Sequence, residues 1–167
     1  MDIILQSINE QEMGELLQPN ERWEGLYLQT EAIPPVHVFE RSCDLIKSGI
    51  APIWAMPYLI IDKNSDAVVG CCGFKAEPNS GTVEVGYNVS SATRGKGIAT
   101  RALKLLSAKA FDSTKVMTVE ALIVSENIPS LRVMAKCGFE YVKVIPDGES
   151  AGLECWRLTK NNLLSIL

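Results

Sequence analysis

The sequence predicts an α+β fold: a mixed, mostly antiparallel central sheet of six to seven strands, packed with helices. Two observations lead to this class. Three strand-like segments separated by turn residues follow one another in the middle of the chain, which is typical of an antiparallel meander. The third of them continues through a glycine-rich loop into a long helix and another strand, which indicates one right-handed parallel unit.

The first third of the chain is expected to contribute an edge strand and two helices. Met1–Leu5 is a short apolar start, and Asn9 is a suitable cap for a helix over Glu10–Leu17. Asn20–Pro35 has little periodicity, so we expect a loop or a broken helix there. Apolar residues at helical spacing predict a helix over Val36–Ser48, which Gly49 would end.

The rest of the chain alternates strands with two helices. β-Branched and apolar runs separated by turn chemistry predict the meander over 53–62, 67–75 and 82–89. A helix beginning near Gly97 follows, then a strand over Lys115–Val124 and a short helix over Ser130–Lys136. Two further strands, 139–145 and 153–158, flank a turn at Pro146–Gly148. No repeat or linker divides residues 1–167, which we expect to form a single domain.

Composition narrows the function classes. The net charge of −4 gives no general attraction to nucleic acid or to anionic membranes. No apolar run is long enough to span a bilayer, and the N-terminus lacks the features of a signal peptide, so we expect a cytoplasmic protein. The five cysteines form no C-x-x-C pair, and His37 is the one histidine, so we expect buried free thiols and no metal site.

The stretch with the clearest chemistry joins the strand over Val83–Val89 to the long helix. Between them lies Arg94-Gly95-Lys96-Gly97-Ile98-Ala99. The first N–H groups of a helix have no intrahelical partner, and the helix dipole is positive there. Glycines allow the backbone to turn tightly and approach a ligand, so this junction predicts a binding site for an anion, most often a phosphate.

The spacing selects one kind of phosphate loop. In a Walker A loop the Gly-Lys pair is followed by Ser or Thr, but Lys96 is followed by Gly97. The dinucleotide fingerprint requires a third glycine where this chain has Thr100. The pattern that fits is Arg/Gln-x-x-Gly-x-Gly/Ala, given by Arg94, Gly97 and Ala99.

A second motif lies about 30 residues downstream. Asn127-x-x-Ser130 is followed by Gly138-Phe139. Together, in this order, the two motifs resemble the cofactor site of the GCN5-related N-acetyltransferase (GNAT) superfamily, and the resemblance extends over roughly Ile53–Leu158. It implies a sheet with helices on both faces, a parallel strand pair that splays apart, and acetyl-CoA as acyl donor with its pantetheine arm in the gap.

The resemblance also assigns cofactor-binding residues. Backbone N–H groups from Gly95 to Thr100 would hold the pyrophosphate, main-chain groups at Val89 would pair with pantetheine beside Tyr87, and Asn127 would bind a pantetheine amide. The full set is Tyr87, Val89, Arg94, Gly95, Lys96, Gly97, Ile98, Ala99, Thr100 and Asn127.

The catalytic candidates are Glu84 and Ser130. Glu84 stands in a strand of Val, Gly and Tyr, where apolar surroundings would favour a general base; an exposed or ion-paired carboxylate is the alternative. Glu120 or a water relay could serve instead. By resemblance, Ser130 lies near the cofactor sulfur. Many superfamily members carry a tyrosine acid where this chain has Met134, so Ser130 or water would have to protonate the thiolate.

We therefore expect an N-acetyltransferase in which a primary amine attacks acetyl-CoA directly, similar to ribosomal-protein alanine and serine N-terminal acetyltransferases. Cys137 as a nucleophile is the less favoured route. The alternatives are a non-catalytic acyl-CoA-binding sensor and a regulator that binds ATP at the same loop. The acceptor stays open among a protein N-terminus, a polyamine, an aminoglycoside and a free amino acid, and the protein is expected to be a monomer or homodimer.

Overall fold

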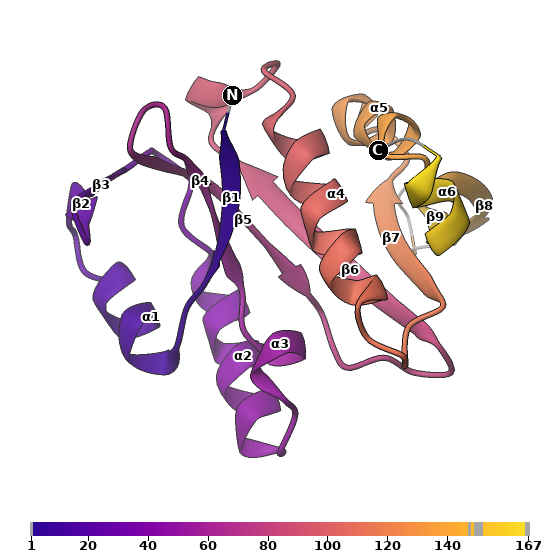
Figure 1. The fold of residues 1–167 in the computed structure, drawn as a ribbon, viewed down its shortest axis with the longest axis horizontal. Coiled ribbons are helices and arrows are strands. Elements are labelled where there is room, and N and C mark those ends of the chain that lie inside the picture. Colours follow the sequence, from indigo (N-terminus) through magenta and orange to yellow (C-terminus); the bar gives the residue numbers. More distant parts are fainter. Residues whose placement is uncertain (1, 147, 149–151, 166–167) are drawn as a thin grey trace.

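A single twisted sheet runs through the computed structural model, which describes residues 2–146, 148 and 152–165 (Figure 1). Its strands are ordered β1-β4-β5-β6-β7-β9-β8, and β3 adds to β5 and carries β2. The elements are β1 (Ile3–Ser7), α1 (Glu10–Leu16), β2 (Arg22–Trp23), β3 (Leu26–Leu28), α2 (Val36–Lys47), α3 (Pro52–Ala55), β4 (Tyr58–Asp62), β5 (Ala67–Phe74), β6 (Thr82–Val89), the 3-10 turn η1 (Ser91–Thr93), α4 (Ile98–Phe111), β7 (Thr118–Val124), α5 (Ile128–Lys136), β8 (Glu140–Ile145), β9 (Leu153–Thr159) and α6 (Lys160–Leu164).

The segment expected to be a loop or broken helix, Asn20–Pro35, instead contains the β2–β3 hairpin. Two residues with positive φ, Glu24 and Gly25, form its turn. The hairpin is held by parallel pairing of β3 with β5 and by Trp23, which is buried in the core. These strands are two and three residues long, too short to leave a periodic pattern in the sequence.

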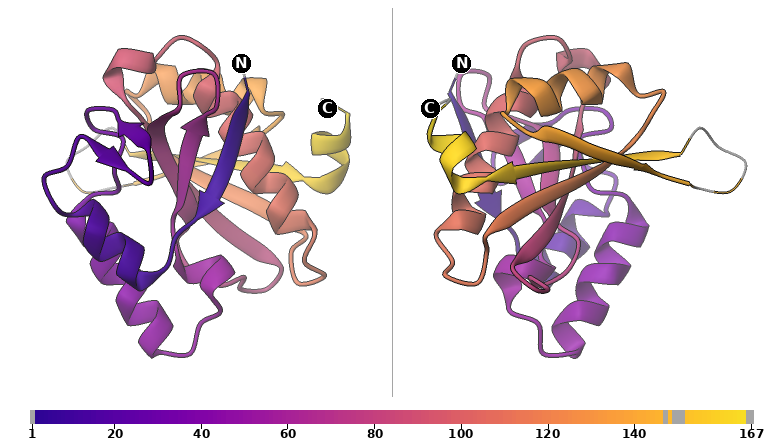
Figure 2. Two further views of the ribbon diagram at one scale, coloured as in Figure 1. Left: turned by 60° about the vertical axis from the view of Figure 1, so that its left-hand side comes forward. Right: turned by 90° about the vertical axis from the view of Figure 1, so that its right-hand side faces the viewer.

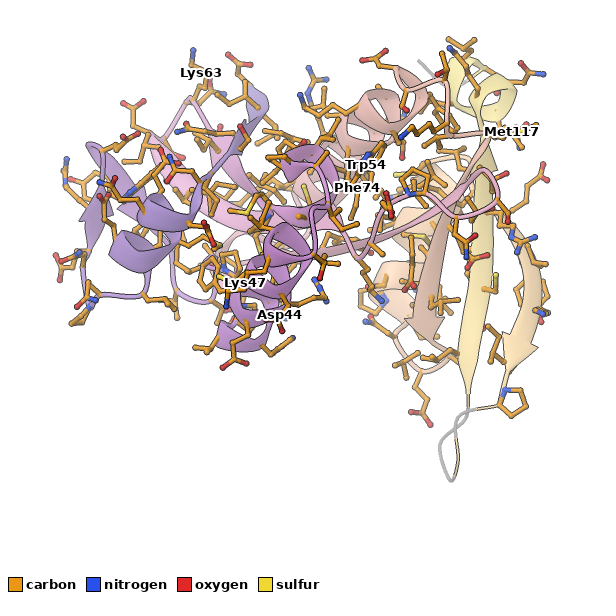
Figure 3. The ribbon with its side chains drawn as sticks, turned by 90° about the horizontal axis from the view of Figure 1, so that it is seen from below. Asp44, Lys47, Trp54, Lys63, Phe74 and Met117 are labelled. Atoms are coloured by element: carbon orange, nitrogen blue, oxygen red, sulfur yellow. The ribbon has the colours of Figure 1, made fainter. Side chains whose placement is uncertain are left out.

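The first strand of the meander begins later than predicted. Pro52–Ala55 forms α3, because a proline fits the first turn of a helix, and β4 starts only at Tyr58. Trp54 of α3 packs against Phe74 of β5 with 4.9 Å between ring centroids (Figure 3). The helix α6 was not anticipated; the Thr159 side chain caps it by accepting from the Asn162 N–H. The turn predicted at 146–148 lies partly outside the described residues.

Helices cover both faces of the sheet, as expected (Figure 2). On one face, α1 and α2 enclose a cluster of buried side chains that includes Met13, Phe39 and Leu59. On the other face, α4 packs through Leu103 and Leu106 onto a larger cluster that includes Val83 and Val85 of β6. Two cores therefore share one sheet, one on each face.

The predicted meander and the parallel unit are confirmed. β4, β5 and β6 pair antiparallel, and α4 connects β6 to β7, which run parallel. The parallel pairing covers only Thr82–Glu84 of β6 and Thr118–Glu120 of β7. Beyond those residues β7 continues beside β9, and the second half of β6 has no strand partner on that side in the described part of the chain. This separation is the feature that positions the candidate site.

Candidate functional site

The N-terminus of α4 is open to solvent and carries no side-chain cap. Gly95 and Gly97 both have φ of 78°, a left-handed conformation that strongly favours glycine. Gly97 is the N-cap residue, and no side-chain hydrogen bond caps the helix within the described part of the chain. An added Cβ at either glycine would meet no atom within 4 Å, so the space above these amides is free. The positive end of a 14-residue helix therefore faces outward, with no side-chain cap from the residues that the structure describes.

These amides border a cavity of about 460 Å³, here called the loop cavity. It lies between the α4 N-terminus, α5 and the unpaired half of β6. Its lining is Tyr87, Asn88, Val89, Thr93, Arg94, Gly95, Gly97, Ile98, Ala99, Thr100, Asn127, Pro129, Ser130, Arg132, Val133 and Lys136. Every residue predicted to bind the cofactor is in this set except Lys96, and Ser130 is there as well. Glu84 is not.

The sequence prediction missed two basic residues of this cavity, Arg132 and Lys136 of α5. They lie four residues apart and therefore on one face of that helix. The sequence signal that could have identified them is two basic residues, four apart, on the short helix that follows Asn127. Together with Arg94, they give the loop cavity a positive lining opposite the α4 terminus.

The free edge of β6 can be derived from the strand register. The Lys75 N–H donates to the Glu84 carbonyl at 2.9 Å, so the main-chain groups of Glu84 point toward β5. Main-chain groups alternate along a strand, and those of Tyr87 and Val89 must therefore point the other way, toward the gap left by β7. This edge is one to which an extended ligand could add as a strand would.

The Arg94 side chain is held by two contacts within the protein. Its Nε donates to the Val89 carbonyl at 3.3 Å, and its Nη2 lies 4.0 Å from the Glu31 carboxylate. The Glu31 main-chain carbonyl in turn accepts from the Asn88 side chain at 2.6 Å. Arg94 therefore ties the loop to β6 and to the segment before α2, in addition to contributing charge.

Asn127 caps α5 and so positions Ser130. Its Oδ1 accepts from the Ser130 N–H at 3.2 Å, which places Ser130 in the first turn of the helix. Across the cavity, the Tyr87 hydroxyl is buried and has no hydrogen-bond partner of acceptable geometry among the described residues. Burial raises the pKa of this phenol, and the nearby Ser130 side chain opposes that effect only in part.

Met134 is fully buried in the core and does not line the loop cavity. The Met134 thioether has no acidic proton, and this position therefore supplies no acid in place of the tyrosine that many superfamily members carry there. Tyr87, from β6, instead brings a phenol to the first turn of α5. The sequence resemblance places Tyr87 only beside the pantetheine arm, because nothing in the pattern of β6 indicates that its phenol is buried near α5.

Glu84 stands in a row of charges that crosses the sheet, where apolar surroundings were expected. It forms an ion pair with Lys75 of β5, and its neighbour in register on β7 is Glu120. Glu120 in turn accepts from Arg157 Nε at 2.7 Å. Strand alternation separates the Glu84 carboxylate from its valine neighbours, which point to the opposite face. Glu84 and Glu120 are the last residues paired between β6 and β7, so the row lies where these strands begin to separate.

A second cavity, here called the α2 cavity, lies on the opposite face of β6 and measures about 240 Å³. Its lining is Pro35, His37, Val38, Arg41, Ser42, Ala55, Pro57, Cys71, Cys72, Gly73, Phe74, Lys75, Gly86, Tyr87 and Asn88. Tyr87 and Asn88 line both cavities. The two cavities therefore approach each other at the unpaired end of β6.

The cysteines near these cavities are poor nucleophiles. Burial raises the pKa of Cys137 to about 12 and that of Cys71 to about 12, and raises the pKa of Cys72 further. The Cys137 thiol is directed to the Thr100 carbonyl at 3.4 Å, in the core beneath α4. All five cysteines are free.

The described residues contain no group of three potential metal ligands. Within the described chain, no helix combines the length and apolarity needed to cross a bilayer.

Comparison with known proteins agrees with this geometry. The family model for the acetyltransferase (GNAT) domain matches residues 4–140. An uncharacterized N-acetyltransferase, p20, from Bacillus licheniformis is 33% identical over 95 residues, which are 56% of this chain and 53% of that protein. The match thus spans about half the length of this curated relative.

Solved structures share the fold at low identity. The aminoglycoside acetyltransferase AAC(6')-Ib in complex with coenzyme A is 15% identical with a TM-score of 0.67, and the match covers 98% of both chains. Mutant forms of the spermidine/spermine N-acetyltransferase SpeG from Vibrio cholerae are 13% identical with a TM-score of 0.68, again over 98% of both chains. These likenesses confirm the predicted fold, including the splayed strand pair.

Burial of four of the five thiols should make them unreactive in the folded protein. At pH 8 a thiol of pKa about 12 is ionised in only about one molecule in 10⁴, and the thiolate is the reactive form. In the native protein, iodoacetamide should therefore modify the half-buried Cys43 first and spare the buried Cys71, Cys72, Cys137 and Cys155, as measured by peptide mass spectrometry. All five should react in denaturant. Rapid native modification of Cys137 would contradict its assignment to the core and reopen the acyl-cysteine route.

Proposed function

The chain belongs to the GNAT acetyltransferase family, and on that premise we propose that it transfers the acetyl group of acetyl-CoA to a primary amine. The observation that carries this proposal is the uncapped N-terminus of α4, open above Gly97 and bordering the loop cavity. Unpaired amides at the positive end of a helix bind phosphate. A CoA thioester has a diphosphate for these amides and a peptide-like arm for the adjoining free strand edge.

Each part of the loop cavity has a role in this proposal. The N–H groups from Gly97 to Thr100 bind the diphosphate, and Arg132 and Lys136 neutralise its charge from α5. The pantetheine arm adds to the β6 edge at Tyr87 and Val89, while the Asn127 side chain contributes both the helix cap and an amide contact. Arg94 fixes the loop against β6 through the Val89 carbonyl. Lys96 lies outside the lining and contributes only distant charge.

The acceptor amine enters from the α2 cavity. That cavity and the loop cavity lie on opposite faces of β6 and share Tyr87 and Asn88, so a thioester carbonyl at this strand end can be approached from both sides. This arrangement favours direct attack by the neutral amine, because both substrates can be bound at once. The raised pKa values of Cys71 and Cys137 further disfavour a cysteine intermediate.

Glu84 is our candidate for the base that receives the amine proton. Its carboxylate lies on the α2 face of β6, the face from which the acceptor enters, and Lys75 links it to the wall of the α2 cavity. Glu120 is the alternative on β7, but Arg157 and Cys155 both donate to its carboxylate. Relay through water is needed in either case, because neither residue lines the cavity.

Tyr87 is our candidate for the proton donor to the leaving thiolate, with Ser130 beside it. The phenol is buried, lines the cavity in which the sulfur would lie, and has no hydrogen-bond partner of acceptable geometry among the described residues. Its raised pKa keeps it protonated at neutral pH, as a donor requires. The free cysteines of the chain fit a reducing compartment such as the cytoplasm.

Thiol release tests the proposed function. With acetyl-CoA and a panel of primary amines, the protein should release CoA thiol in proportion to acetylated amine, as followed by a thiol reagent and mass spectrometry. In calorimetry, Gly97→Ala should weaken CoA binding about tenfold or more, because its Cβ intrudes where the diphosphate approaches the amides.

The matched control for that variant is Gly49→Ala. Gly49 has φ of 83° and open space around it, but it follows α2 and lines neither cavity. It should therefore suffer the same backbone strain without loss of CoA affinity. Tight CoA binding without thiol release on any amine would favour the non-catalytic sensor. No CoA binding by the folded protein would reject both functions.

Glu84→Gln should lower the rate constant about a hundredfold at pH 7 without changing the Kd for CoA, because it removes the proton acceptor alone. The rate of this variant should recover as the pH rises, since more of the amine in solution is then neutral. Glu120→Gln is the matched variant and should retain most of the activity. If Glu120→Gln is the slow variant, the base is misassigned; if neither is slow, the proton leaves through water alone.

Tyr87→Phe should lower kcat about tenfold to a hundredfold while preserving packing and CoA affinity, because only the hydroxyl is lost. Tyr27→Phe is the control, since that exposed tyrosine lies outside both cavities. The measurement is steady-state kinetics with each variant. Full activity in Tyr87→Phe would show that the phenol only flanks the pantetheine arm, as the sequence alone suggested.

A further inference from the structure

The α2 cavity has an unusual charge for the acceptor side of an enzyme that acts on amines. Three of its lining residues can carry positive charge: His37 and Arg41 from α2, and Lys75 from β5. None of its lining residues is acidic. Lys75 is already paired with Glu84, which leaves Arg41 as the fixed cation of the cavity without an ion-pair partner among the described residues. A polycationic acceptor would be repelled here.

Arg41 itself is poorly satisfied. Its Nε is buried and has no hydrogen-bond partner among the described residues, and its own helix neighbours Glu40 and Asp44 do not ion-pair with it. An arginine is always charged, and a buried donor without a partner is destabilising unless a ligand accepts from it. Arg94 and Arg157, by contrast, both donate through Nε to protein oxygens. The Arg41 guanidinium therefore presents partly desolvated N–H donors in the wall of the α2 cavity.

We propose that the acceptor is a small amine that also carries an anionic group, a carboxylate or a phosphate, which Arg41 binds in the α2 cavity. This inference rests on the proposed function. The guanidinium fork matches both anions in geometry, and the amine of the same molecule can then extend toward Asn88 and Tyr87, where the two cavities meet. At about 240 Å³ the cavity is smaller than the 300 to 1,000 Å³ that is typical of drug-sized ligands, which suits an amino acid better than a large acceptor.

The acceptor class would differ from that of the two structural neighbours described above, whose names specify aminoglycoside and spermidine or spermine, all polycationic amines. Acetylation removes the positive charge of the amine and leaves the anion in place. The N-acetylated product therefore retains the group that Arg41 binds, and it can be used to probe the site without turnover.

The first test compares matched acceptors in the thiol-release assay. Phenylalanine and O-phosphoethanolamine represent the carboxylate and phosphate sources, and phenylalaninamide and spermidine lack an anion. We expect kcat/KM to favour at least one anionic acceptor over phenylalaninamide by tenfold or more. Arg41→Gln should remove that preference mainly through KM, and leave phenylalaninamide turnover and the Kd for CoA unchanged. A preference for spermidine, or equal loss on all acceptors, would overturn the proposal.

The second test needs no catalysis. N-acetylphenylalanine should bind the wild-type protein in a calorimetric titration in the presence of CoA, and its carboxamide should bind at least tenfold more weakly. Arg41→Gln should equalise the two, whereas Arg22→Gln, at an exposed arginine outside the cavity, should not. Thermal melts confirm that both variants fold. If wild type binds acid and amide alike, or binds neither, Arg41 holds no anion, whether or not the protein is an acetyltransferase. Absence of CoA binding would count against the proposed function instead.

Discussion

The parallel pairing of β6 with β7 covers only three residues on each strand, and this early separation determines where ligands can bind. A row of four charged residues, Lys75, Glu84, Glu120 and Arg157, crosses the sheet where the pairing ends, with the two carboxylates in the middle and a cation at each end. Past it, the main chain of β6 has hydrogen-bonding groups on one edge that no strand of the described residues pairs with. Both cavities approach this edge, one from each face. A bound molecule that adds as a strand completes the sheet there.

The α4 N-terminus acts together with that edge because the chain passes directly from one to the other. Only eight residues separate Val89 from Ile98, and two of them are glycines at positive φ. Arg94 anchors this connection to the Val89 carbonyl. The amides at the helix terminus and the strand edge are therefore held in a fixed relation, so a diphosphate and a peptide-like arm in one molecule can bind both. On the opposite face, the segment before α2 is linked to the same strand through Asn88 and Glu31.

The sequence predicted those parts of the structure that depend on local chemistry. Each of these features is encoded within a few neighbouring residues: the α1 cap at Asn9, the turns of the meander, and the glycines before α4. The parts it missed depend on tertiary contacts. The β2–β3 hairpin is held by pairing with β5, and the insertion of β9 between β7 and β8 leaves no local signal. For Glu84 the ion-paired alternative holds in place of the favoured apolar surroundings, and its partner could not be foreseen because Lys75 lies on another strand, nine residues earlier. Tyr87 and Arg41 stand out only once burial is known.

The central claim is that the amides at the start of α4 bind the diphosphate of CoA. A ¹H–¹⁵N NMR titration of the uniformly labelled protein with CoA tests it most directly, because it reports on each amide separately. The account predicts that the amide signals of Gly97, Ile98, Ala99 and Thr100 show the largest shifts, together with Tyr87 and Val89 on the strand edge, and that inorganic pyrophosphate reproduces only the shifts at the helix. Saturable CoA binding that leaves those helix amides unperturbed would contradict it.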